Sequence, residues 1–184
     1  DFVDIDYESN NISIEALRLK LENAEANNRL PKVIIPVHMG GKSCDMKSIY
    51  KLSQKYGFKI IEDASHAIGA TYNNSKVGSC KYSDITVLSF HPVKIITTAE
   101  GGAALTNNKN LFDKLQLFRS HGITREVDNM KNAPHGGWYY EQIDLGFNYR
   151  MTELQAALGC SQIKRIENFV LKRNNIAEFY NQEF

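Results

Sequence analysis

The order of apolar and polar residues predicts alternating helices and strands. Over residues 11–27, apolar side chains recur at helical spacing, and Ser13 and Asn11 are available as N-caps. This stretch is therefore predicted to be an amphipathic helix whose buried face carries Ile14, Leu17, Leu21 and Ala24.

A strand, a helix and a second strand follow. Residues 32–38 are a continuous apolar run rich in branched side chains, which predicts a buried strand. Residues 46–56 have helical spacing, with Asp45 as the expected N-cap and Gly57 at the end. The short apolar run 58–64 is the next strand. Such a βαβ unit within one sheet is almost always parallel and right-handed.

The second half continues the alternation. Strands are expected over 84–90 and 101–107, followed by a helix over 111–122 and helical structure from Thr152 to the end of the sequence. Between these helices, residues 122–143 are polar and contain proline, glycine and the cluster Trp138, Tyr139 and Tyr140, which predicts a long loop. We expect this loop to serve at a subunit interface or as a lid, and slightly favour the interface. The whole pattern predicts an α/β fold with a mainly parallel central sheet flanked by helices.

Composition excludes several classes of partner. Lys and Arg total 22 and Asp and Glu total 21, so a net charge of +1 gives no field that would attract nucleic acid or an anionic membrane. The three cysteines lack metal or disulfide spacing, which favours a reducing cytoplasm. The longest apolar runs are far below the roughly 20 residues that cross a bilayer. No metal site is expected, and three histidines are interpreted as core or hydrogen-bonded residues: His38, His91 and His121. Of these, His91 is the first candidate for an exception, because it neighbours Ser89.

Chemically useful side chains gather where two predicted strands end. In open α/β sheets, ligands bind beyond the carboxyl ends of the parallel strands. The first strand end carries Glu62 and Asp63, followed by Ser65 and His66. The next carries Ser89, His91 and Lys94.

Three of these residues fit one cofactor. A buried carboxylate at Asp63 needs a cationic partner, which a pyridinium nitrogen would supply. Lys94, in a partly desolvated turn, could act as an amine nucleophile, and Ser89 could hold a phosphate. These are the parts that pyridoxal phosphate requires. Taken singly, a strand-end aspartate is more often a cap, and a lone lysine is usually solvated.

Five ordered motifs carry a family resemblance: IPVHMGGKSCDM, IIEDASHAIGATYNNSKVGS, SFHPVKIITTAEGGAALTN, LFRSHG and LGFNYRMTELQAALG. Together they resemble the DegT-type sugar-nucleotide aminotransferases, which are fold type I pyridoxal phosphate enzymes. The segments SFHPVK, TTAEGG and GGWYYE are most similar to the 4-keto sugar aminotransferases of pseudaminic acid biosynthesis. This resemblance implies amino transfer from glutamate to a UDP-linked 4-keto-6-deoxy N-acetylhexosamine, in pseudaminic acid or related surface-sugar biosynthesis.

The resemblance also implies roles for individual residues. Lys94 corresponds to the lysine that binds the coenzyme covalently, and Asp63 to the carboxylate that pairs with its ring nitrogen. His66 stands where many relatives have glutamine beside the ring, and Ser89 corresponds to a serine that contacts the phosphate. Asn148 corresponds to an asparagine that reaches the site of the neighbouring subunit, which implies a homodimer with shared active sites.

The same resemblance predicts the domain organisation. Residues 1–164 are expected to be part of the large coenzyme-binding domain, whose N-terminal portion would lie upstream. Residues 165–184 are expected to form a helix that leads toward a C-terminal small domain. A related branch of the family has histidine in place of the lysine and dehydrates its sugar, so Lys94 favours transamination. The alternative is a non-catalytic α/β module that binds the coenzyme without turnover.

Overall fold

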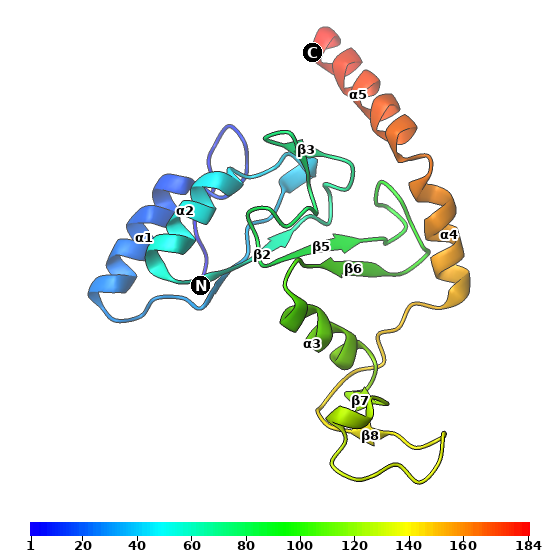
Figure 1. Cartoon of the computed structure of the whole chain (residues 1–184). Helices are drawn as coiled ribbons and strands as arrows, with labels where there is room; N and C mark the ends of the chain where they lie inside the picture. Colours follow the sequence, from blue (N-terminus) through cyan, green and yellow to red (C-terminus); the bar gives the residue numbers. More distant parts are fainter. The chain divides into compact units, whose positions relative to one another are not determined.

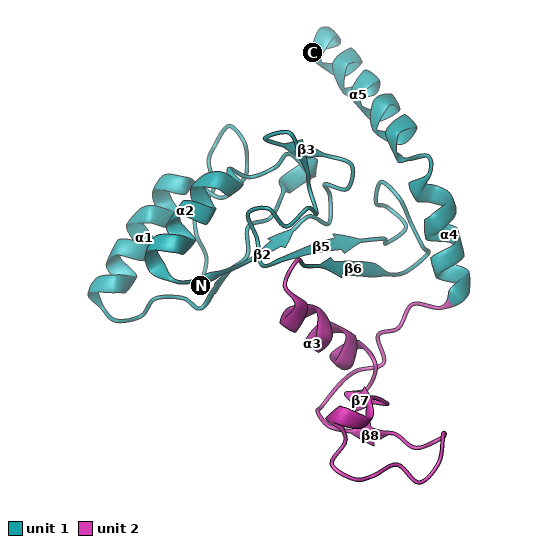
Figure 2. Cartoon of the chain, viewed as in Figure 1, with its two compact units in different colours: residues 1–106, 153–184 teal, residues 107–152 magenta.

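The computed structural model describes all residues from Asp1 to Phe184, which form two compact units. Unit 1 comprises Asp1–Thr106 and Glu153–Phe184, and unit 2 comprises Asn107–Thr152 (Figure 2). The domain boundary expected at residue 164 stays a prediction.

Unit 1 contains a central sheet and most of the helices (Figure 1). Its elements are α1 (Ile14–Ala26), β1 (Val33–Ile34), η1 (Met39–Gly41), α2 (Met46–Tyr56), β2 (Lys59–Asp63), β3 (Thr71–Tyr72), β4 (Ser75–Lys76), β5 (Ile85–Ser89), β6 (Gly102–Leu105), α4 (Glu153–Ile163) and α5 (Ile166–Glu183). Unit 2 contains α3 (Lys109–Arg119), β7 (Ile123–Thr124), η2 (Val127–Asn129) and β8 (Glu141–Gln142).

The central sheet has the strand order β1-β2-β5-β6. Strand β2 runs parallel to both β1 and β5, and β6 closes one edge antiparallel to β5. The predicted α/β class with a mainly parallel sheet is confirmed. The predicted βαβ unit is β1-α2-β2.

Local end signals of the first two helices act as expected. Ser13 caps α1 by accepting a hydrogen bond from the N–H of Ala16 at 3.2 Å. Asp45 caps α2 by accepting from the N–H of Ser48, and Gly57 ends the helix with a left-handed φ of 77°. The C-terminal region is helical, as predicted, and consists of two helices, α4 and α5, of which α5 corresponds to the helix expected over 165–184.

One face of the sheet is covered by helices of unit 1. Leu17 and Leu21 of α1 and Ile49 of α2 pack with Ile34 and Ile60 of the first two strands. A second cluster includes Leu88 of β5 and is contacted by Ile166 and Phe169 of α5. Its buried members are Ala64, Ala67, Ile68, Leu88 and Ile96. We call this side the covered face.

The other face of the sheet is open, which corrects the prediction of a buried strand over 32–38. Val33, Ile35 and Val37 keep 42%, 57% and 40% of their surface exposed, whereas Ile34 and Pro36 between them are buried. Side chains alternate between the two faces of a strand, so an apolar run is buried throughout only if both faces are covered. We call this side the open face.

The long loop in unit 2 is confirmed, although it contains the short antiparallel pair β7-β8. Glu141 organises it by accepting hydrogen bonds from the N–H groups of Lys131 and Asn132 and from the hydroxyl of Tyr139. These contacts, led by the Lys131 N–H, lower the pKa of Glu141 to about 2. Trp138 stays 68% exposed.

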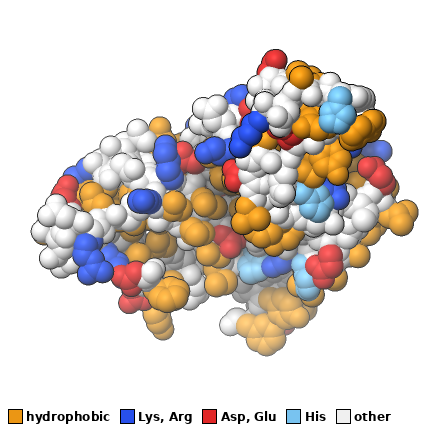
Figure 3. Space-filling view, turned by 90° about the horizontal axis from the view of Figure 1, so that it is seen from below, with side chains coloured by type: hydrophobic (Ala, Val, Ile, Leu, Met, Phe, Trp, Pro, Cys, Tyr) orange, Lys and Arg blue, Asp and Glu red, His pale blue; other side chains and the backbone are white.

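The surface carries both signs of charge, as the net charge of +1 suggests. Figure 3 shows basic and acidic side chains interspersed with hydrophobic ones over the face in view. None of the helices combines the length and apolar character that spanning a membrane would require.

Candidate active site

Lys94 lies in a loop that is fixed at both ends. The N–H of Phe90 donates to the carbonyl of Gly101, and the N–H of Thr98 donates to the carbonyl of Phe90. The N–H of Thr97 donates to Oε1 of Gln162 on α4 at 3.2 Å. The loop that carries the lysine is thus attached both to β5 and to α4.

The small residues of this loop allow close packing. Thr98 is buried, and a Cβ on Gly159 of α4 would come within 2.8 Å of its methyl group. A Cβ on Gly102 would lie 2.7 Å from the carbonyl oxygen of Leu88. Contacts this short do not occur, so any larger residue would displace its neighbour. The structure therefore gives these small residues a packing role.

His66 and Lys94 line one cavity of about 620 Å³. Lys94 is half-buried and its N–H closes a turn onto the carbonyl of His91 at 3.0 Å. Gly41 forms part of the wall with a φ of 93°, and a Cβ there would lie 2.8 Å from the carbonyl oxygen of His66. The cavity falls in the size range of small-molecule sites.

Asp63 ends β2 on the open face. Its neighbours across the sheet are Val37 on one side and Val87 on the other. Its carboxylate accepts the N–H of Ser65 at 3.0 Å, and none of the ion pairs in the structure involves it. A half-buried carboxylate beside two valines, with no cationic partner in the chain, has the environment expected if a ligand supplies the positive charge.

Ser89 ends β5, the strand beside β2, on the same open face. Its hydroxyl accepts the N–H of His91 at 3.4 Å. The structure thus brings Asp63 and Ser89 to neighbouring strand ends. Neither residue lines the cavity that holds His66 and Lys94.

Asn148 lies in unit 2, where it forms an isolated antiparallel bridge with Ser120. Its side chain is exposed. Phe147 and Tyr149 on either side stack at 4.9 Å and are themselves 52% and 73% exposed. Asn148 therefore lies in an exposed aromatic segment, and its place relative to the other four residues is still a prediction.

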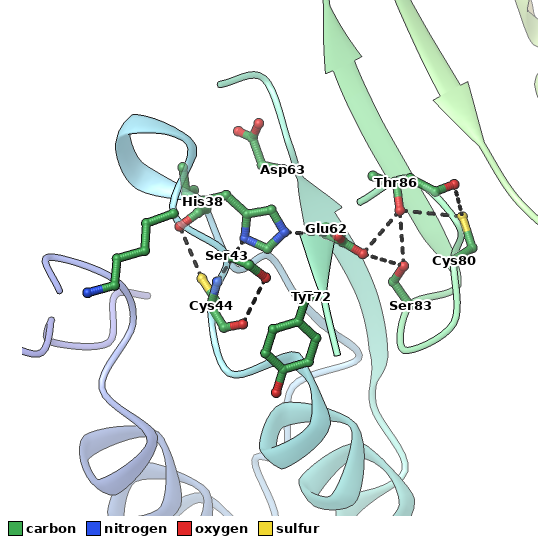
Figure 4. Close-up of polar contacts among 12 residues, drawn as sticks. His38, Ser43, Cys44, Glu62, Asp63, Tyr72, Cys80, Ser83 and Thr86 are labelled. Carbon is green, nitrogen blue, oxygen red and sulfur yellow. Dashed lines mark hydrogen bonds and ion pairs between the residues drawn. The ribbon is translucent and has the colours of Figure 1, made fainter. Parts of the chain in front are cut away.

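Glu62 is not part of the ligand crevice, which corrects the prediction that grouped it with Asp63. It points to the covered face and is 5% exposed. Its carboxylate accepts hydrogen bonds from Nε2 of His38 at 2.8 Å, the hydroxyl of Ser83 at 2.8 Å and the hydroxyl of Thr86 at 3.1 Å (Figure 4). In the same figure Asp63 points away from this network.

His38 is a buried, hydrogen-bonded core residue, as the sequence suggested. Its Nδ1 accepts the N–H of Cys44 at 3.1 Å, so the ring proton lies on Nε2 and is donated to Glu62. Burial raises the pKa of Glu62, but the hydrogen bonds from His38, Ser83 and Thr86 outweigh it, and the pKa is lowered overall. We call His38, Glu62, Ser83 and Thr86 the buried network.

At Cys44 burial is not outweighed by hydrogen bonds, so the net shift of the pKa is upward. Burial raises the pKa of this thiol to about 11, so the group stays protonated and donates to the carbonyl of Val37. All three cysteines are free, and no group of three or more His, Cys, Asp or Glu side chains is placed to hold a metal ion.

The residues fit pyridoxal phosphate on chemical grounds. Lys94 offers an amine in a cavity, Asp63 offers an unpaired carboxylate, and Ser89 offers a hydroxyl at the adjacent strand end. His66 lines the same cavity as Lys94 and follows Asp63 by three residues. The cavity residues His66 and Lys94 are therefore close in sequence to the strand-end residues Asp63 and Ser89.

Comparison with known proteins decides the family. The sequence profile of the DegT/DnrJ/EryC1/StrS aminotransferases matches residues 1–184, the whole chain. The chain belongs to this family. A UDP-4-amino-4,6-dideoxy-N-acetyl-beta-L-altrosamine transaminase of Campylobacter jejuni is 38% identical over 184 residues, which are all of this chain and 45% of the relative. The chain therefore spans about half the length of the curated relatives it matches.

Solved structures agree with the fold. The aminotransferase PseC of Helicobacter pylori, described as involved in the biosynthesis of pseudoaminic acid, superimposes with a TM-score of 0.86 at 37% identity. The alignment covers 99% of this chain and 44% of that one. The PLP-form of a putative sugar aminotransferase of Streptococcus pneumoniae matches with a TM-score of 0.76 at 25% identity, over 98% of this chain and 46% of that one. The likeness spans both units, although each matched protein is more than twice as long.

Proposed function

We propose that this chain is part of a pyridoxal phosphate-dependent aminotransferase that acts on a nucleotide sugar. The substrate we propose is a UDP-linked 4-keto-6-deoxy N-acetylhexosamine, with glutamate as the amino donor. The observation that carries the proposal is that His66 and Lys94 line the same cavity in a chain of this family. Asp63, three residues before His66, has no ion-pair partner and supports it.

Each site residue has a defined task in this proposal. Pyridoxal phosphate, when bound, supplies an aldehyde and an electron-accepting ring. The Nζ of Lys94 would bind the coenzyme and, once the amine of the donor has displaced it, would move a proton to and from the reacting carbon of the substrate. The carboxylate of Asp63 keeps a proton on the ring nitrogen. The hydroxyl of Ser89 binds the phosphate, and His66 contacts the ring.

The choice of sugar rests on similarity. The C. jejuni relative is named as a transaminase of a UDP-linked 4-amino-4,6-dideoxy sugar, and the H. pylori structure is described as part of pseudoaminic acid biosynthesis. We therefore propose that this chain acts in pseudaminic acid biosynthesis or in a related route to a surface polysaccharide.

The proposal includes a homodimer with shared active sites. Asn148 would reach the coenzyme phosphate or the substrate of the partner subunit. The exposure of Leu145, Phe147 and Tyr149 beside it supports a surface that a second subunit covers, because aromatic side chains are enriched in subunit interfaces. A sedimentation measurement on the protein tests this point, and a monomer at micromolar concentration would refute it.

The proposal also places the reaction in the cytoplasm. Cys44, Cys80 and Cys160 are all free thiols, and free thiols are typical of proteins in reducing compartments.

Product formation tests the function directly. The protein in its longest natural form is incubated with glutamate, pyridoxal phosphate and either a UDP-linked or a GDP-linked 4-keto-6-deoxy sugar, and the products are identified by mass. We expect an amino sugar from the UDP-linked substrate, and a loss of at least about 1,000-fold in rate for Lys94→Arg, because the guanidinium cannot replace the amine.

Lys81→Arg is the matched control, because Lys81 is exposed and lies outside the cavity. This variant is expected to keep the parent rate. Coenzyme binding without product from any 4-keto sugar would favour the non-catalytic module instead.

A further inference from the structure

Helix α5 changes character along one of its faces. Near its start, Ile166 and Phe169 pack against the second core cluster. Val170 packs against Gly69, and a Cβ on this glycine would lie 2.8 Å from Cγ2 of Val170. An ion pair between Lys76 and Glu167 at 3.0 Å also holds this first part of the helix. The beginning of α5 is thus anchored by packing.

The next turns of the same face line the cavity that contains Lys94. Val170, Arg173, Asn174 and Ala177 all belong to its wall, and their spacing of three and four residues places them on one side of the helix. Apolar contacts therefore give way to a guanidinium and an amide where α5 passes the cavity. A helix face that only closes a core would continue with apolar residues.

The charge of the cavity wall is one-sided. Lys94, His66 and Arg173 are its ionisable side chains, and no Asp or Glu belongs to it. Arg173 takes part in none of the ion pairs of the structure. A cavity with this lining favours an anion, and a planar guanidinium suits the paired oxygens of a carboxylate or a phosphate.

We propose that Arg173, assisted by the amide of Asn174, is the subsite that binds an oxyanion of the substrate in this cavity. The inference rests on the proposed function and adds a residue that recognises the substrate. The oxyanion is either the carboxylate of the amino donor or the diphosphate of the nucleotide sugar. Both present oxygens that a guanidinium binds through two parallel hydrogen bonds.

Equilibrium binding separates the two sources. Glutarate, which has the carboxylates of glutamate without the amine, and UDP are titrated calorimetrically into the parent protein in its longest natural form and into Arg173→Gln. We expect one of the two probes to bind about 10- to 100-fold more weakly to the variant, the range for losing hydrogen bonds to a charged group. Weaker binding of glutarate to the variant would identify the donor carboxylate as the bound oxyanion, and weaker binding of UDP would identify the diphosphate. Unchanged affinity for both probes overturns the inference.

Steady-state kinetics provide the second readout. In Arg173→Gln, KM for the matching substrate rises while KM for the other substrate stays within about twofold, and Arg173→Lys restores part of the loss because it keeps the charge. Lys172→Gln removes the same charge from the neighbouring residue, which is outside the cavity wall, and is expected to leave both constants unchanged. An equal effect in Lys172→Gln would show that general charge, and not this subsite, is responsible.

The outcome can be told apart from a failure of the proposed function. Covalent capture of pyridoxal phosphate by Lys94 is measured on the same samples by borohydride reduction. Absence of capture in the parent protein contradicts the proposed function. Full capture in Arg173→Gln with unchanged binding of both probes contradicts only the subsite.

Discussion

The two faces of the central sheet use the same strands in different ways. On the covered face, Glu62 and Thr86 are buried and fully hydrogen-bonded. On the open face, Asp63 follows Glu62 by one residue and Ser89 follows Thr86 by three. Both keep hydrogen-bonding capacity for a ligand. Consecutive residues of a strand point in opposite directions, so Glu62 and Asp63 can serve different purposes. An acidic pair at a strand end can therefore consist of one structural and one chemical carboxylate.

The largest contrast is expected between truncations of these two neighbours. Glu62→Ala leaves His38, Ser83 and Thr86 without their shared acceptor, so we expect a loss of about 3–5 kcal/mol in the free energy of unfolding, since each buried donor left without an acceptor costs about 1–3 kcal/mol. Asp63→Ala removes one hydrogen bond on the open face, and we expect a loss of no more than about 1 kcal/mol. Urea unfolding of both variants measures the difference. Equal losses would show that the two faces do not differ in the way described.

Apolar residues offer a second, somewhat smaller contrast. Ile60 is buried on the covered face, whereas Ile35 is 57% exposed on the open face. Ile60→Ala is expected to lower the free energy of unfolding by about 2–4 kcal/mol, and Ile35→Ala by less than about 1 kcal/mol. Both variants lose the same atoms, so burial is the variable. If Ile35→Ala destabilised as strongly as Ile60→Ala in urea unfolding, another part of the protein would have to cover the open face.

Much of this arrangement could be predicted from local signals. Asp45 and Gly57 fixed the ends of α2 because capping and a left-handed C-terminal residue are decided within a few positions. The sequence places Asp63 and Ser89 at the ends of two predicted strands, and the sheet makes these two strands neighbours. The separation of Glu62 from Asp63 was also accessible, since the alternation of β2 alone assigns them to opposite faces. The β3-β4 hairpin also has a local signal in the sequence, because Asn73 and Asn74, both with positive φ, favour a tight turn.

Other features depend on tertiary structure and could not be predicted. Val33, Ile35 and Val37 form an apolar run whose exposure depends on what lies above the sheet, and the run itself carries no such information. The partnership of His38 with Glu62 joins residues that are 24 positions apart. The place of Arg173 at the cavity depends on how α5 packs, and a single arginine on a polar helix has no distinguishing sequence pattern.

A pH measurement provides the smallest expected effect. Cys44 belongs to the core cluster on the covered face, and burial raises the pKa of its thiol to about 11 from an ordinary value of 9. Its neutral form therefore contributes stability that is fully present below pH 9 and is lost as the pH rises from 9 to 11. We expect Cys44→Ala to lose less stability than the parent over this interval, by about 1–3 kcal/mol.

Cys160 is the matched control for this titration, because it is exposed. Cys160→Ala is expected to follow the parent protein throughout the range in urea unfolding at each pH. Identical pH profiles for the parent and Cys44→Ala would mean that the thiol of Cys44 is not shielded as described.

The proposed function depends on covalent binding of the coenzyme by Lys94 and on the support that Asp63 gives to the coenzyme ring. It is tested most directly by reducing the protein with borohydride in the presence of pyridoxal phosphate and locating the modified lysine by peptide mass. We predict modification at Lys94, with at least about tenfold weaker coenzyme binding in Asp63→Asn because the ring nitrogen loses its charged partner. Modification spread over exposed lysines such as Lys81, or coenzyme affinity unaltered in Asp63→Asn, would contradict the account.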